Sequence, residues 1–117
     1  MNRKELKKQY QQTLQPMGIY QIRNRKNGKI YIGCSKNLAG KLNSHKFQLK
    51  NGLHPNKEMQ KEFNEIGEEG FSFEILDHLN PGEDLSRDYM EELKAFEEMW
   101  MEKLMPFNEK GYHQEKH

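Results

Sequence analysis

The chain has 117 residues, of which 33% are hydrophobic and 32% charged, and its formal net charge is +1. This length fits one domain with a modest core, and the near-neutral charge excludes a globally basic, histone-like binder. The single cysteine, Cys34, excludes an internal disulfide and indicates a reducing compartment. No run approaches 18 apolar residues, and the charged start lacks the apolar core of a signal peptide, so we expect a cytoplasmic protein with no membrane segment.

Charge is distributed unevenly along the chain. Residues 1–50 contain twelve Lys and Arg but only one acid, Glu5, whereas most acids follow Glu58. The pattern indicates a phosphate-binding face in the first half, although solvated helix surfaces would produce the same pattern.

The first predicted element is an amphipathic helix within residues 1–16, because Leu6, Tyr10 and Leu14 recur every four residues until Pro16. Strands rich in Ile and Tyr are predicted at 18–23 and 29–33. Their connection ends in Asn-Gly, a strong hairpin signal, so the tyrosines of the two strands should come close together.

Two helices and a strand are expected next. Ser35 or Asn37 can cap a helix that ends at Asn51-Gly52, and Pro55 opens a second one that ends at Gly67. Phe71, Phe73 and Ile75 alternate with polar residues, which predicts a strand with one buried face. A last helix is predicted over 86–103, before Pro106, giving the order α–β–β–α–α–β–α in an α+β fold.

The last helix contains the most informative side chain. Glu97 lies within an apolar stripe formed by Tyr89, Leu93, Phe96, Trp100 and Leu104. A carboxylate directed toward a core is costly unless it is paired or binds a cation, so an ion pair, a frayed helix edge and a metal site are the alternatives.

Other residues allow both structural and functional interpretations. Tyr20 and Tyr31 on a hairpin are commonly packing residues, and His45 on an inner helix stripe is commonly a core histidine. His54 lies in a loop where solvent could reach it, and His113 belongs to a tail, residues 113–117, that we expect to have no role.

Taken together, these residues resemble the GIY-YIG nuclease family. Gly18-Ile19-Tyr20 and Tyr31-Ile32-Gly33, with ten residues between the tyrosines, match its signature. The similarity covers residues 17–112 and continues through His45, His54 and Glu97 to Asn108 and Gly111-Tyr112. It implies a three-stranded antiparallel sheet flanked by helices, preceded here by the extra amino-terminal helix.

The resemblance also implies a chemistry. Glu97 would hold one Mg²⁺ or Mn²⁺, and Tyr20 or Tyr31 would activate the attacking water with help from His45. A phenol has a pKa near 10, so it needs a nearby cation to act as a base near neutral pH. Contacts with nucleic acid, expected to be DNA, are assigned to Arg23, Lys29, Lys36, Lys46 and His54.

One position departs from the family pattern. Nucleases of this family carry an arginine four residues before the helical histidine, and here that position is Lys41. Lysine lacks the planar fork that grips a phosphate through two bonds, and losing a preorganised donor typically costs ~10²–10³ in rate.

Two functions follow from this resemblance. One is a metal-dependent endonuclease, with Tyr20, Tyr31, Lys41, His45 and Glu97 lining one pocket on one side of the sheet. The other is a catalytically impaired domain that binds nucleic acid, for instance in transcription control. From the sequence we expect no separate DNA-recognition domain, and a stand-alone catalytic domain typically has weak intrinsic specificity or works as a homodimer.

Overall fold

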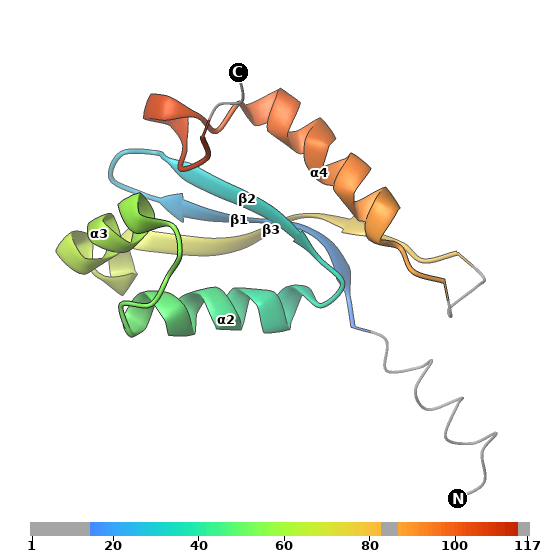
Figure 1. The fold of residues 1–117 in the computed structure, drawn as a ribbon, viewed down its shortest axis with the longest axis horizontal. Helices are drawn as coiled ribbons and strands as arrows, with labels where there is room; N and C mark the ends of the chain where they lie inside the picture. The colour runs from blue at the N-terminus through green and yellow to red at the C-terminus, as the bar shows by residue number, and fades with distance from the viewer. Residues whose placement is uncertain (1–14, 83–86, 115–117) are drawn as a thin grey trace, which may run out of the picture.

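The computed structural model describes residues 15–82 and 87–114 (Figure 1). Its elements are β1 (Met17–Asn24), β2 (Ile30–Ser35), α2 (Leu38–Lys50), α3 (Lys57–Ile66), η1 (Glu68–Gly70), β3 (Phe71–Leu79), α4 (Met90–Leu104) and η2 (Asn108–Lys110). The helix expected within residues 1–16 lies outside the described residues. None of the helices within the described ranges has the length and apolar character needed to cross a bilayer.

The three strands form one antiparallel sheet in the order β2-β1-β3. Helices α2 and α3 lie on one face and α4 on the other, so the sheet is enclosed between helices as expected (Figure 1). The core beneath α2 and α3 comprises Ile22, Leu49, Met59, Phe63, Phe71 and Tyr112. A smaller cluster under α4 contains Met17, Tyr89 and Leu93.

Asparagine side chains begin both helices beside the sheet. Asn37 caps α2, as one of the two expected alternatives, by accepting a hydrogen bond from Gly40 N–H at 3.0 Å. Helix α3 begins at Lys57, two residues after Pro55, which was expected to open it, because Asn56 caps the helix by accepting from Met59 N–H at 3.0 Å through its Oδ1. The free backbone N–H groups of a first helical turn favour such an oxygen acceptor.

Two boundaries of the later elements also differ from the expectation. Helix α4 begins at Met90 rather than near residue 86, because the Asp88 carboxylate accepts from Met90 N–H in a local turn. Strand β3 continues to Leu79, and Ile75 on its expected buried face is 44% exposed. Helix α2 packs against β1 and β2 and so leaves this edge strand less covered.

A buried polar network attaches the carboxyl-terminal segment to the hairpin. The Asn24 amide, fully buried, donates to Glu62 Oε1 at 2.9 Å and to Tyr112 Oη at 3.1 Å. Tyr112 O–H also donates to Glu62, and Tyr112 N–H donates to Ile30 O at 3.0 Å. The residues after α4 are therefore held alongside β2.

Candidate active site

The two glycines of the sequence signature are required by close approaches. Gly33 lies opposite Tyr20 in the β1–β2 register, and a Cβ there would fall 2.2 Å from the Tyr20 phenol oxygen. At Gly18 a Cβ would fall 2.0 Å from Asp77 O, next to the point between Ile19 and Tyr20 where the pairing of β1 with β3 shifts in register. Glycine at these two positions lets the Tyr20 ring lie flat across β2 and lets β3 pair closely with β1.

A chain of hydrogen bonds leads from Tyr20 into α2 and the loop after it. Tyr20 Oη lies 2.8 Å from His45 Nε2, and His45 Nδ1 lies 2.8 Å from His54 Nε2. All three side chains are at most 5% exposed. His54 is therefore an internal member of the site, which corrects the expectation of a loop residue open to solvent.

The backbone of Asn56 sets the direction of this chain. Asn56 N–H donates to His54 Nδ1 at 3.0 Å, so neutral His54 carries its proton on Nε2. His54 then donates to His45 Nδ1, and His45 donates from Nε2 to the Tyr20 oxygen. Burial, with smaller effects from His54 and Lys41, lowers the pKa of His45 to about 4, so both tautomers persist near neutral pH.

The second tyrosine is held by histidine rings. Tyr31 meets His45 at 5.5 Å between ring centroids and His54 at 6.0 Å, both edge-on, and it stacks on His113 at 4.7 Å. Its ring is on the same face of the sheet as Ile22, its partner in the register, and it is partly exposed. The Tyr31 side chain is thus partly exposed to solvent, whereas the Tyr20 side chain is buried.

Glu97 reaches this site from the opposite face. It lies on α4, which packs on the other side of β2 (Figure 1), and its side chain is 24% exposed with Lys94 Nζ 3.9 Å away. The carboxylate is near enough to help raise the pKa values of both tyrosines, where burial is the larger cause. Glu97 therefore lies on the other side of the sheet from His45, not on the one side that was expected for all five residues, and it acts on the two tyrosines electrostatically.

Cys34, on β2, is hydrogen-bonded to Glu97 of α4. Burial and a hydrogen bond to Glu97 raise the pKa of the Cys34 thiol to about 11, so it remains protonated near neutral pH. The thiol is a donor to the carboxylate and not a nucleophile.

The lysines of α2 and its preceding loop differ in their surroundings. Lys41 is exposed, and its ammonium lowers the pKa values of His45 and His54 alongside the larger effect of burial. Lys46 lies over the Phe73 ring at 5.0 Å, and Lys36 Nζ is 3.5 Å from Asp88 on the α4 side. Lys41 is thus the cation that the structure places beside the histidine chain.

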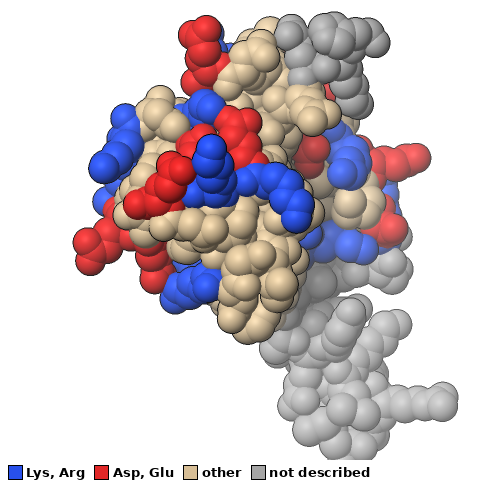
Figure 2. All heavy atoms as spheres, turned by 60° about the vertical axis from the view of Figure 1, so that its left-hand side comes forward, with Lys and Arg blue, Asp and Glu red and all other residues tan. Residues whose placement is uncertain are grey.

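Two other predicted contacts with nucleic acid lie elsewhere. The Lys29 ammonium is bonded to Glu58, with Glu62 3.5 Å away, so its charge is already neutralised. Arg23 is exposed and follows Ile22 on β1, so it projects from the face opposite Tyr20. On the side of the molecule in Figure 2, Lys and Arg lie among Asp and Glu and form no patch of one sign.

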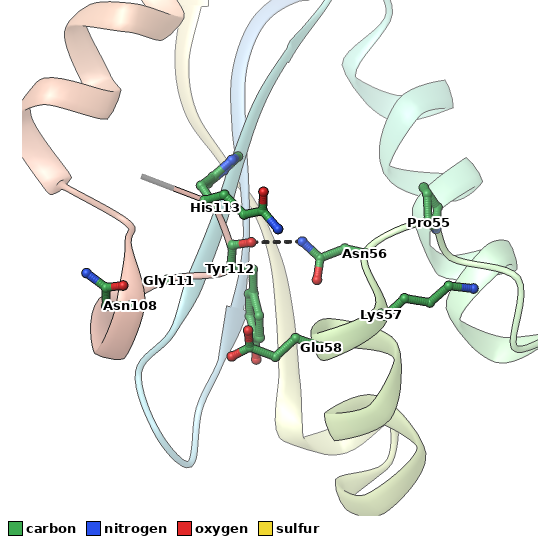
Figure 3. A pocket seen from close by; sticks show the side chains of 9 residues that line it. Pro55, Asn56, Lys57, Glu58, Asn108, Gly111, Tyr112 and His113 are labelled. Carbon is green, nitrogen blue, oxygen red and sulfur yellow. Dashed lines mark hydrogen bonds between the residues drawn. The ribbon is translucent and has the colours of Figure 1, made fainter. Parts of the chain in front are cut away.

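His113 was assigned to the tail, but the structure places it in the site. Its Nε2 accepts from Ile32 N–H at 2.8 Å, and it lines two hollows. One contains Glu97 and Phe107, and the other contains Asn56 and Lys57 (Figure 3). Only the position of this histidine directly after Tyr112, where the resemblance ends, could have pointed to it in the sequence.

The family model for the GIY-YIG catalytic domain matches residues 16–112, and the chain belongs to this family. It is 35% identical over 68 residues to Intron-associated endonuclease 1 of Enterobacteria phage T4, a match that covers 58% of this chain and 27% of that protein. The chain thus spans about a quarter of this curated relative.

Solved structures show the same relationship over most of the domain. The catalytic domain of homing endonuclease I-TevI is 30% identical with a TM-score of 0.65, covering 82% of this chain and 95% of that one. A point mutant of the catalytic domain of intron endonuclease I-TevI is 29% identical with a TM-score of 0.61, covering 77% and 84%. The chain therefore contains a GIY-YIG catalytic domain similar in sequence and fold to that of the homing endonuclease I-TevI.

Proposed function

We propose that this domain is a metal-dependent endonuclease that hydrolyses phosphodiester bonds of DNA. The supporting observation is the oriented chain from Asn56 N–H through His54 and His45 to Tyr20, which ends within electrostatic reach of Glu97. DNA is proposed as the substrate because the relatives are intron and homing endonucleases.

Glu97 is the proposed ligand of the metal. Within residues 15–82 and 87–114 no three His, Cys, Asp or Glu side chains are grouped to hold an ion, so a protein cage of several ligands is not available there. One partly exposed carboxylate suits Mg²⁺ or Mn²⁺, because Mg²⁺ keeps most of its water ligands. A bound ion supplies positive charge to the phosphoryl and leaving oxygens.

Tyr20 is the proposed acceptor of the proton from the attacking water, as the phenolate that forms once its own proton has been released to bulk water. Burial raises its pKa, and Tyr31 and Glu97 add to the effect, so the phenolate needs stabilisation. The His45 N–H donates to the phenol oxygen at 2.8 Å, and a hydrogen bond to the charged form favours that form. Tyr31, at the rim, and Lys41 would contact the phosphate.

Nicking of supercoiled plasmid tests this function. Wild-type protein should convert the plasmid to the open circular form with Mg²⁺ or Mn²⁺ and not with EDTA. Glu97→Gln and Tyr20→Phe, which preserve side-chain shape, should each reduce the rate at least ~10²-fold. Glu91→Gln, an exposed carboxylate in the first turn of the same helix, should cleave like the wild type. Cleavage that survives Glu97→Gln would remove the metal assignment.

Lys41 favours a second candidate, an impaired domain that binds nucleic acid without cutting it. This exposed ammonium stands where the family resemblance places a bidentate arginine. If no DNA or RNA is cleaved but binding falls steeply with salt, the binding function replaces the nuclease. Binding that does not change between low and physiological salt would argue against both, since each requires phosphate contacts.

A further inference from the structure

His113 is held in place by its own backbone. Tyr112 N–H donates to Ile30 O at 3.0 Å, and His113 N–H donates to Pro106 O at 3.1 Å. The segment is therefore bridged in parallel to β2 at Ile30–Gly111, and a second parallel bridge, Phe107–His113, ties it to the residues directly after α4. The backbone hydrogen bonds of Tyr112 and His113 therefore hold the imidazole ring at the outer edge of β2.

The ring makes two contacts with consecutive residues of β2. Its Nε2 accepts from Ile32 N–H at 2.8 Å, and its face stacks on Tyr31 at 4.7 Å between centroids, with 19° between the ring planes. Ile32 N–H is a donor on the open edge of the sheet, and His113 satisfies it. Because Nε2 accepts, neutral His113 carries its proton on Nδ1.

We propose that His113 is a positioning residue for Tyr31, fixing the phenol against the edge-on rings of His45 and His54 by stacking on its other side. The proposal rests on the nuclease function proposed above, in which Tyr31 contacts the phosphate. Without the stack, the Tyr31 ring would lose one of the three aromatic contacts that the described residues make with it, and the phenol would sample other positions. Misplacing a reacting group by about 1 Å can cost 10²-fold in rate.

The first test is spectroscopic and independent of cleavage. A long-range ¹H–¹⁵N spectrum of the wild-type protein should show His113 protonated on Nδ1 and unprotonated on Nε2 near pH 7. The Ile32 amide should exchange slowly with solvent for a residue on a sheet edge. A His113 protonated on Nε2, or an Ile32 amide that exchanges like an unpaired one, would overturn the proposed contact.

Three substitutions separate the two contacts. His113→Gln can place an acceptor near Ile32 N–H but loses the stack, His113→Phe keeps a stacking ring but loses the acceptor, and His113→Ala loses both. Tyr31 ring-proton shifts should change in the Gln and Ala variants and stay closer to wild type in the Phe variant.

We expect the kcat for nicking to fall about tenfold to a hundredfold in His113→Ala, with KM changed less than about threefold. His78→Ala, at an exposed histidine on β3, is the matched control and should cleave like the wild type.

The outcomes distinguish this inference from the proposed function. If the wild-type protein cleaves nothing, the nuclease function fails, and the Ile32 exchange and Tyr31 shifts still decide whether His113 positions the ring. If His113→Ala lowers the melting temperature while kcat and the Tyr31 shifts remain unchanged, His113 only anchors the carboxyl-terminal segment and the proposal is overturned. Should the Ala variant fail to fold, the Gln and Phe variants carry the same comparison.

Discussion

The phenol oxygen of Tyr20 lies across Gly33 so closely that a Cβ on the glycine would be 2.2 Å away from it. This contact explains in physical terms why the second half of the signature ends in glycine. It also links the sheet register to the chemistry, because the same oxygen is the end of the histidine chain.

Gly33→Ala should therefore displace Tyr20 and break its hydrogen bond with His45. We expect a destabilisation of about 1–3 kcal/mol from overpacking and a loss of nicking of at least ~10²-fold, measured by chemical denaturation and plasmid relaxation. Gly28→Ala is the control, because a Cβ there would meet nothing within 4 Å. Alanine at its φ of +79° should cost about 1 kcal/mol of stability and leave the position of Tyr20 unchanged. Full activity in Gly33→Ala would contradict the role of the Tyr20 oxygen.

Lys41→Arg should raise the rate of nicking at least tenfold, or about 1.4 kcal/mol in transition-state stabilisation. Arginine offers two parallel donors to the charge that develops on the phosphoryl oxygens, whereas lysine offers one compact charge. Single-turnover nicking at a fixed Mg²⁺ concentration measures the effect. Lys50→Arg, at an exposed position at the end of the same helix, should change nothing. An unchanged rate in Lys41→Arg would show that lysine is already an adequate substitute.

Gly40→Ala should leave stability nearly unchanged, even though alanine favours a helix interior by about 1 kcal/mol over glycine. A Cβ at Gly40 would lie 2.7 Å from Asn37 Nδ2, and that side chain is the α2 cap. The helix gain is offset by disturbance of a cap worth about 0.5–2 kcal/mol. Denaturation of Gly40→Ala, Asn37→Ala and the double variant checks this, because the substitution should stabilise only once the cap is absent. A stabilisation near 1 kcal/mol in the single variant would show that the cap adjusts freely.

Stability should fall as the pH is lowered from about 6.5 to about 4. Burial, followed by His54 and Lys41, lowers the pKa of His45 from 6.5 to about 4, so the unfolded chain binds more protons in this window than the folded protein does. The effect of this residue is at most about 3 kcal/mol. Urea denaturation at several pH values should show a smaller slope in His45→Gln than in the wild type. His78→Gln, an exposed histidine, should keep the wild-type slope; equal slopes in all three proteins would mean that His45 is not buried as a neutral ring.

Local signals in the sequence were sufficient for most of the architecture. The Asn-Gly turn, the alternating apolar residues and the glycine after α3 each depend on a few neighbouring residues, and the structure confirms the hairpin, the order of elements from β1 to α4 and the enclosed sheet. The predicted helix starts were wrong where a side chain binds the backbone locally: α3 begins after the cap Asn56 and not at Pro55, and α4 begins at Met90, whose N–H donates to Asp88.

The sequence by itself also determined the family and singled out Tyr20, Tyr31, Lys41, His45 and Glu97, because these residues stand at the signature's spacing or interrupt an apolar pattern. Only the tertiary structure decided how such residues meet. Glu97 lies on α4, on the face opposite His45, and both helices pack against the edge strand β2, so the Glu97 carboxylate contributes to the raised pKa of Tyr20. His54 is buried and its ring accepts a hydrogen bond from Asn56 N–H. His113 lies beside Tyr31 because its ring accepts a hydrogen bond from Ile32 N–H on the edge strand. Contacts of this kind join residues far apart in the chain and leave no periodic or local signal, so the folded backbone alone specifies them.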